Sequence, residues 1–313
     1  MFGKRRSFVF AVFLTALFTS SCIKNINDDI PKTEPKLVIN GIINPDSIFK
    51  VNISKTVHVF ENETQQNLPF IQGAVVKVFK DGEFLFNLDE GNNGYYLKSG
   101  FYPSRAHIYK VEVEKAGYTT ISAETGLPDF IPVNDFDTTI RITTDYGYPE
   151  TVIDCKLQYH DPAGVENYYR LDCFVSYTDN DGVTFVERQY VYVDDANSHL
   201  YDKDYSYLLW SDVLNDGNDV TVDFNTYVYF YPDENSGMNS DSVELTYTVF
   251  LSTMSEDYYK YDKTRSLYYE NGGSSDPFTE PVLIYTNVDN GYGIFGGAGS
   301  DTISFKYLYE IQK

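Results

Sequence analysis

A cysteine that follows a short apolar run is the first residue whose chemistry the sequence suggests. Lys4, Arg5 and Arg6 precede the apolar run 8–18, and small residues then lead to Cys22. The run is far shorter than the ~20 residues of a membrane-spanning helix, so residues 1–21 are predicted to be a lipoprotein signal peptide. The thiol of Cys22 would then carry a lipid, and two or more acyl chains anchor a protein stably. The alternative is an ordinary secretory signal in which the cysteine has no role.

The two other cysteines flank a predicted turn at 161–164. If the strands on either side form a hairpin symmetric about Gly164, Cys155 and Cys173 face each other closely enough for a disulfide. An exported protein would permit that oxidation. The alternative is a pair of buried free thiols that act as small hydrophobic side chains. A register slip of one residue would favour this alternative, because it puts the cysteines on opposite faces.

A glycine motif near the C-terminus matches a dinucleotide fingerprint in its letters, as Gly291-x-Gly293-x-x-Gly296. The fingerprint requires a helix after the glycines and an acid about 20 residues further on. Here a strand is predicted to follow, and the chain ends too soon for the acid. We therefore predict a glycine-rich loop near a sheet edge and no nucleotide cofactor.

Acidic and histidine residues suggest other chemistry without forming a complete motif. Asp179-Asn-Asp181-Gly182 and the loop 233–241 contain calcium-ligand residue types, but the spacing better fits turns. We assign no metal site, although calcium in these acidic loops is left open. The histidines lack the i, i+4 spacing of a zinc pair, and no Gly-x-Ser-x-Gly motif exists; they are His58, His107, His160 and His199. No catalytic residue is assigned.

The charge of the chain excludes one class of partner. The formal net charge is −22, and residues 1–21 hold three basic residues and no acid, so the mature chain carries about −25. Phosphate backbones would repel such a protein, and nucleic acid is therefore not an expected partner. We interpret the charge as favouring solubility.

The elements that must position these residues are mainly strands, since Tyr and Phe are abundant and favour strands. After a lipidated tether at 22–36, short alternating segments such as 49–53 and 109–113 and the turn Asp81-Gly82 predict a β-sandwich over 37–130. A second, larger antiparallel β domain is predicted over 131–313. Its strands are expected at 151–160, 168–178, 185–193, 219–231, 243–252, 282–287 and 302–309.

One helix is predicted in the second domain. Thr253 and Glu256 have the spacing of a capping box, and Asn271-Gly272-Gly273 would end the helix. Met254, Tyr258, Tyr261 and Tyr268 then share one face, which we expect to pack on a sheet. The alternative is a platform of tyrosines that binds a ligand.

The order of several short motifs resembles the DUF4249 family of Bacteroidetes lipoproteins over essentially the whole mature chain. These motifs are Pro35–Gly41, Ile71–Val78, Gly94-Tyr-Tyr96, Asn167-Tyr-Tyr169, Glu280-Pro-Val282, Asn287 and Gly291–Gly296. The first domain is also similar to immunoglobulin-like and transthyretin-like sandwiches, through the strand Tyr109-x-Val-x-Val113 followed by Gly117-Tyr118. The acids Asp28 and Asp29 after Cys22 resemble a surface-export signal of such lipoproteins.

The resemblance implies a non-enzymatic accessory of a TonB-dependent receptor, with a role in nutrient capture. The abundant aromatic residues offer stacking surface for a glycan or peptide ligand. The resemblance also implies an outer-membrane location, with the Cys22 lipid as anchor and the body facing the cell exterior. Two alternatives stay open. One is a structural or adhesive surface module, and the other is a hydrolase with a pair of carboxylates, for which no residues can be nominated.

Overall fold

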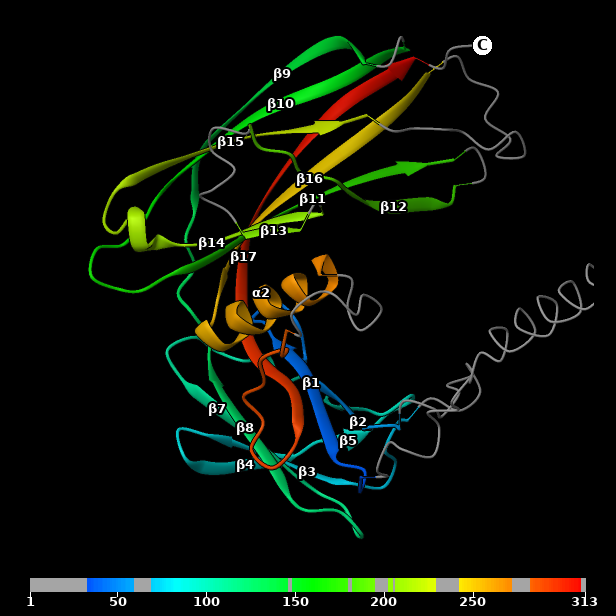
Figure 1. Cartoon of the computed structure of the whole chain (residues 1–313), viewed down its shortest axis with the longest axis vertical. Helices are drawn as coiled ribbons and strands as arrows, with labels where there is room; N and C mark the ends of the chain where they lie inside the picture. Colours follow the sequence, from blue (N-terminus) through cyan, green and yellow to red (C-terminus); the bar gives the residue numbers. More distant parts are fainter. Residues whose placement is uncertain are drawn as a thin grey trace, which may run out of the picture. The chain divides into compact units, whose positions relative to one another are not determined.

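The structure is a computed structural model that describes residues 33–58, 69–145, 148–179, 182–194, 202–204, 206–228, 242–271 and 282–310. Contacts divide the chain into two compact units, one of residues 1–35 and 57–68 and the other of residues 36–56 and 69–313. The helices and strands named below belong to the second unit (Figure 1). The predicted signal peptide, Cys22 and most of the predicted tether lie outside the described residues.

Eight short strands build the N-terminal sandwich. One layer has the order β4-β3-β7-β8, and the other contains β1-β2-β6-β5. The strands are β1 (Leu37–Ile43), β2 (Phe49–Lys55), β3 (Val75–Lys80), β4 (Glu83–Asn87), β5 (Asp89–Glu90), β6 (Tyr95–Lys98), β7 (Ile108–Glu114) and β8 (Ile121–Gly126). The predicted turn is confirmed, because Asp81 and Gly82 have φ values of 51° and 85°, as a two-residue hairpin turn with positive φ requires.

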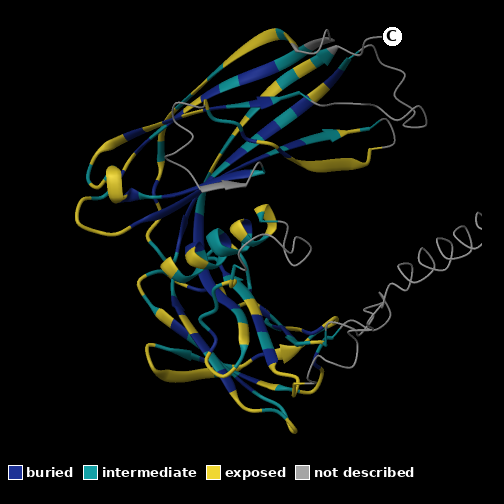
Figure 2. Ribbon diagram, in the orientation of Figure 1, coloured by how far each residue is buried: buried dark blue, intermediate teal, exposed yellow. Residues whose placement is uncertain are grey.

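The core of this sandwich comes from the alternation of side chains along each strand. Phe49 and Val51 of β2 face Val111 and Val113 of β7, and each is at most 1% exposed. Figure 2 shows buried and exposed residues alternating along the strands. The mainly β fold with a sandwich layout, predicted from the same alternation, is confirmed.

The second body is larger and again has two sheets. One is the three-stranded sheet β15-β10-β9, and the other contains β13-β14-β11-β16-β17 with β12 beside β11. Their bounds are β9 (Val133–Asp145), β10 (Tyr148–His160), β11 (Tyr168–Thr178), β12 (Thr184–Gln189), β13 (Asp202–Asp204), β14 (Tyr207–Ser211), β15 (Asp219–Tyr227), β16 (Ser242–Met254) and β17 (Tyr292–Glu310). A 3₁₀ turn, η3 (Asp212–Leu214), precedes β15. Side chains from both sheets form a second core.

The last strand, β17, takes part in both bodies (Figure 1). Its first part pairs in parallel with β1, from Val38↔Tyr292 to Ile43↔Gly297, and the rest pairs antiparallel with β16. The strand predicted over 302–309 is confirmed as part of β17. The glycine-rich loop predicted before it was wrong, because the strand begins ten residues earlier. Phe295 is fully buried in the N-terminal core. The predicted boundary between residues 130 and 131 stays a prediction. Strand β17 follows that boundary in the sequence, yet it pairs with strands of both bodies.

Close packing explains the glycines of β17. A Cβ at Gly297 would lie 2.2 Å from the backbone oxygen of Gly126, and one at Gly296 would lie 2.7 Å from Cβ of Tyr258. Gly293 has a φ of +100°, and its Cβ would lie 2.0 Å from the backbone oxygen of Ile39. The glycines thus allow the end of β8, Tyr258 and β1 to approach the strand closely.

Residues 282–288 have no regular secondary structure, so the strand predicted at 282–287 was wrong. The side chain of Asn287 instead takes the place of a strand neighbour. Its Oδ1 accepts from the N–H of Phe295 at 3.0 Å, and its Nδ2 donates to the backbone oxygens of Phe295 at 2.8 Å and Glu124 at 3.1 Å. Asn287 therefore links β8 to β17.

The predicted helix exists as α2 (Glu256–Glu270), but its start and its buried face differ from the prediction. Thr253 and Met254 belong to β16, and the N-cap is Ser255, whose Oγ accepts from the N–H of Gly297 at 3.1 Å rather than from the helix. The C-cap is Asn271, as predicted. The predicted tyrosine face is confirmed only for Tyr258, which packs on the cluster that contains Met254. The buried helical residues are Tyr259, Asp262 and Ser266.

Candidate functional site

The two central cysteines are not brought together by the predicted hairpin. Cys155 of β10 pairs across its sheet with Thr138 and Phe224, whereas Cys173 of β11 lies in the other sheet. The strands β10 and β11 therefore belong to different layers, and the hairpin was wrong. Both cysteines are buried free thiols in the shared core. Burial raises the pKa of Cys173 to about 12, and burial with the nearby Cys173 raises the pKa of Cys155 further.

The acidic turn and the histidines that the sequence singled out lie apart from one another. Oδ1 of Asp179 accepts from the N–H of Val183 at 2.8 Å, which is the role of a turn residue. His107 pairs with Asp81 next to the sheet that contains β3 and β7, whereas His160 pairs with Asp219 in the three-stranded sheet. Residues 180, 181 and 199 and the loop 233–241 lie outside the described residues, as does Cys22, whose lipidation stays a prediction.

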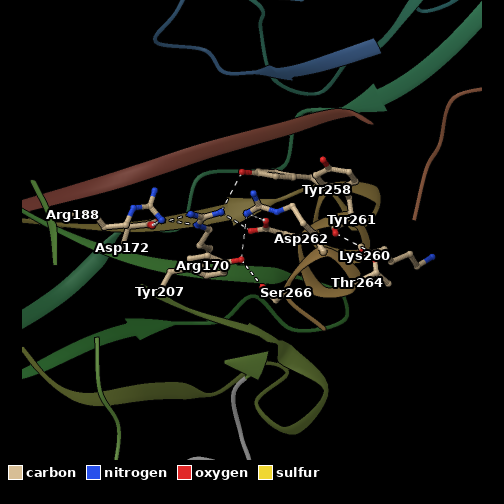
Figure 3. Close-up of polar contacts among 11 residues, drawn as sticks. Arg170, Asp172, Arg188, Tyr207, Tyr258, Lys260, Tyr261, Asp262, Thr264 and Ser266 are labelled. Atoms are coloured by element: carbon tan, nitrogen blue, oxygen red, sulfur yellow. Dashed lines mark hydrogen bonds and ion pairs between the residues drawn. The ribbon is translucent and has the colours of Figure 1, made fainter. Parts of the chain in front are cut away.

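A buried ion-pair network that sequence reasoning missed joins α2 to strands β11 and β12 (Figure 3). Arg170 of β11 donates to Asp172 at 2.7 Å and to Asp262 of α2 at 2.5 Å. Arg188 of β12 adds a contact of 3.0 Å to Asp172, and Arg265 adds one of 2.7 Å to Asp262. Arg170 and Asp262 are 8% and 1% exposed, so the charges are neutralised mainly by one another.

The surroundings of Arg170 complete the network. Its guanidinium lies 3.9 Å from the centre of the Tyr207 ring, and the Tyr207 hydroxyl lies 2.7 Å from Oγ of Ser266. Burial alone would lower the pKa of Arg170, but hydrogen bonding to Asp172 and the nearby negative charges raise it above its ordinary value. Removing one member of such a buried pair costs about 3–5 kcal/mol. The network therefore fixes the position of α2, and we assign it no catalytic role.

Three carboxylates meet where the loop after β10 approaches η3. Asp161, Asp212 and Asp216 place ligand oxygens within 4.8 Å of one another, and the first two are buried. Each accepts from an N–H of the opposite loop, from Gly217 at 3.0 Å, Asn167 at 2.7 Å and Gly164 at 2.6 Å respectively. Burial and the neighbouring acids raise the pKa of Asp212 despite the bond from Asn167. Through these hydrogen bonds the three carboxylates connect the two loops to each other.

A pocket of about 440 Å³ is hollowed into the outward face of the three-stranded sheet. Strand β9 contributes Asp137, Thr139 and Arg141 to its lining. Facing them are Asp154 and Lys156 of β10, Asp223 and Asn225 of β15, and Asp194 of the segment after β12. We call this the sheet pocket. Its volume lies within the range of small-molecule sites, roughly 300–1,000 Å³.

Cross-strand pairing brings the residues of the sheet pocket together. Asp154 pairs with Thr139 on one side and Asn225 on the other, and Lys156 pairs in the same way with Asp137 and Asp223. Arg141 donates to Asp154 at 2.7 Å. Alternation along β10 could have revealed the outward residues of that strand, but the register with β15, about 70 residues away, has no local signal. The sheet pocket was therefore missed.

A comparison with models of protein families matches residues 23–304 to a domain of unknown function, DUF4249. No curated protein matches the chain. Within the described residues, no helix is both long and apolar enough to span a membrane.

Proposed function

The chain belongs to the DUF4249 family, and from this premise we propose that it is a lipid-anchored outer-membrane protein that faces the cell exterior and serves a TonB-dependent receptor. In this proposal the protein binds a ligand for the receptor and catalyses no reaction. The family carries no assigned activity. The receptor role is what the resemblance to the family implies, and the ligand-binding role rests on the residues of this chain.

The observation that carries the proposal is the sheet pocket. Its outward side chains offer hydrogen-bond donors and acceptors over three strands at once. A rigid sheet holds such groups at fixed spacing, which favours recognition because little entropy is lost on binding. Binding is also consistent with the lack of a nucleophile–base motif in the sequence.

Two features of the sequence support the location. The basic residues 4–6, the apolar run 8–18 and Cys22 form a lipoprotein signal. The strongly negative mature chain would be repelled by anionic lipid headgroups, so attachment would depend on the acyl chains. The acids Asp28 and Asp29 add the resemblance to a surface-export signal.

Purification from native membranes tests the proposal. The tagged full-length protein would be solubilised in mild detergent from cells that make it naturally, and Cys22→Ala would serve as control. We expect one stoichiometric β-barrel receptor to co-purify with the wild-type protein, and the Cys22→Ala protein to leave the membrane fraction without it. Wild-type protein that stays in the membrane but brings no barrel would contradict the receptor role. Wild-type protein in the soluble fraction would contradict the anchor.

A further inference from the structure

We infer that the sheet pocket binds an uncharged saccharide. This inference deepens the proposed function and rests on it for the view that the pocket binds without catalysing. It selects a glycan over a peptide as the ligand and names the residues that contact it. The surroundings of the pocket disfavour anions, divalent cations and apolar ligands, and each class is taken in turn below.

The charges around the pocket disfavour anions. Four carboxylates line it, those of Asp137, Asp154, Asp194 and Asp223, against the two cations Arg141 and Lys156. The lining therefore has a local excess of negative charge within a chain of net charge −22. A phosphate, a uronic acid or another acidic ligand would meet more like charges than opposite charges in this pocket.

The positions of the carboxylates disfavour a divalent cation. Among the described residues, Asp161, Asp212 and Asp216 are the group of three acidic, histidine or cysteine residues whose ligand atoms lie within 4.8 Å of one another. The carboxylates of the sheet pocket do not converge in this way, although calcium needs six to eight oxygens around one point. The carboxylate of Asp154 also forms an ion pair with Arg141.

The lining of the pocket offers no exposed apolar surface for an apolar ligand or an apolar peptide side chain. The two apolar residues of the lining, Cys155 and Phe224, are 4% and 3% exposed, and their side chains belong to the core on the other side of the sheet. The remaining lining side chains are polar or charged. A peptide anchor normally needs a hydrophobic pocket for its side chain, and this pocket does not offer one.

The remaining polar groups suit a ligand whose hydroxyls both donate and accept. Outward side chains on neighbouring strands lie about 4.5–5.5 Å apart, so Lys156 between Asp137 and Asp223 presents a donor flanked by two acceptors. Asn225 can supply both kinds of bond, and its Oδ1 is a buried atom with no hydrogen-bond partner among the described residues. Adjacent hydroxyls on a sugar ring can bridge such alternating groups.

Two tyrosines lie beside Asn225, just outside the lining of the pocket. Tyr227 lies two residues beyond Asn225 on β15, and its ring meets that of Tyr192 at 5.2 Å between centroids. Tyr192 is held beside β15 by backbone hydrogen bonds with Asn225 in both directions, of 2.9 and 2.8 Å. A tyrosine ring has an apolar face with a polar tip, and the C–H face of a sugar ring packs well on such a surface.

Binding to an array of immobilised uncharged and acidic glycans tests the inference, with the mature lipoprotein in detergent as probe. We expect signals on uncharged glycans, and the affinity for the best of them would then be measured in solution. Asp223→Ala should weaken it at least tenfold, because a hydrogen bond to a charged group is lost, and Asn225→Ala about fivefold. The matched control is Thr221→Ala, which changes an exposed residue on the same face of β15 but outside the pocket lining.

Three results would overturn the inference. One is that no uncharged glycan binds, and another is that acidic glycans bind more tightly than uncharged ones. The third is that Asp223→Ala and Thr221→Ala bind the glycan equally well while both keep the wild-type circular dichroism spectrum. The receptor proposal is tested separately by co-purification. A glycan signal without a co-purified barrel would leave the sheet pocket assignment intact and remove the receptor.

Discussion

Whether Cys155 and Cys173 can form a disulfide depends on which sheet each of their strands joins. Both thiols are buried in the core between two layers, and burial raises their pKa values, to about 12 for Cys173. The thiolate is the reactive form, so neither cysteine should react while the protein is folded.

Thiol counting with an aromatic disulfide reagent checks this prediction. We expect no reaction with the native mature protein and two thiols per chain after unfolding in guanidinium, because Cys22 would be blocked by its thioether. A count of three would show that Cys22 is unmodified. A count of zero after unfolding would show that Cys155 and Cys173 form a disulfide after all.

Asp212 provides a prediction of pH dependence. Its pKa is raised by burial and by Asp161, Asp216 and Glu166, so the folded chain holds this proton more tightly than the unfolded chain. The stabilisation is fully present below the ordinary value of 3.8 and is lost as the pH rises through the higher folded-state pKa. Above that pH the charged carboxylate is less favourable in the fold.

Asp212→Asn should remove this dependence, because the amide oxygen can still accept from the N–H of Asn167 while the charge is gone. The free energy of unfolding in urea would be measured for both proteins at several pH values from 4 to 7. We expect the variant to gain stability relative to the wild type as the pH rises. A constant difference across this range would mean that the titration of Asp212 does not affect stability.

Strand β17 and helix α2 show which features of an element can be predicted from local sequence pattern. Other features of the same elements are set by contacts with residues far away in the sequence. The turn Asp81-Gly82 and the alternation in β2 and β7 are local, and the sequence predicted them correctly. The inward face of α2 contains Asp262 and Ser266, and an apolar stripe could not reveal it because its partner Arg170 is 92 residues away. The sheet pocket was missed for the same reason, since the β10–β15 register has no local signal.

The close packing around the glycines of β17 predicts that adding a side chain at one of them destabilises the fold. Gly297→Ala would place a Cβ 2.2 Å from the backbone oxygen of Gly126, which cannot move as a side-chain tip can. We expect the free energy of unfolding to fall by about 1–3 kcal/mol, as measured by urea denaturation. Gly299→Ala is the matched control on the same strand, because its Cβ would lie 3.3 Å from the end of the Arg105 side chain. Equal losses in the two variants would contradict the packing explanation.

For the whole molecule, β17 raises the question of whether the two cores unfold together. The strand contributes Phe295 to the N-terminal core and pairs along its second part with β16 of the other body, and both cores belong to one compact unit. Independent domains would share few contacts, whereas a shared strand couples their stabilities. We therefore predict a single cooperative unfolding transition.

The single tryptophan of the chain makes this coupling measurable, because Trp210 lies in the second core. Phe295→Ala removes a fully buried ring from the first core and should cost about 3–5 kcal/mol, which corresponds to a fall in Tm of roughly 5–10 °C for a chain of this size. If the cores are coupled, the transition seen by Trp210 fluorescence falls by the same amount as that seen by circular dichroism. If Trp210 instead reports the wild-type Tm while part of the circular dichroism signal is lost earlier, the cores unfold separately and β17 joins two independent domains.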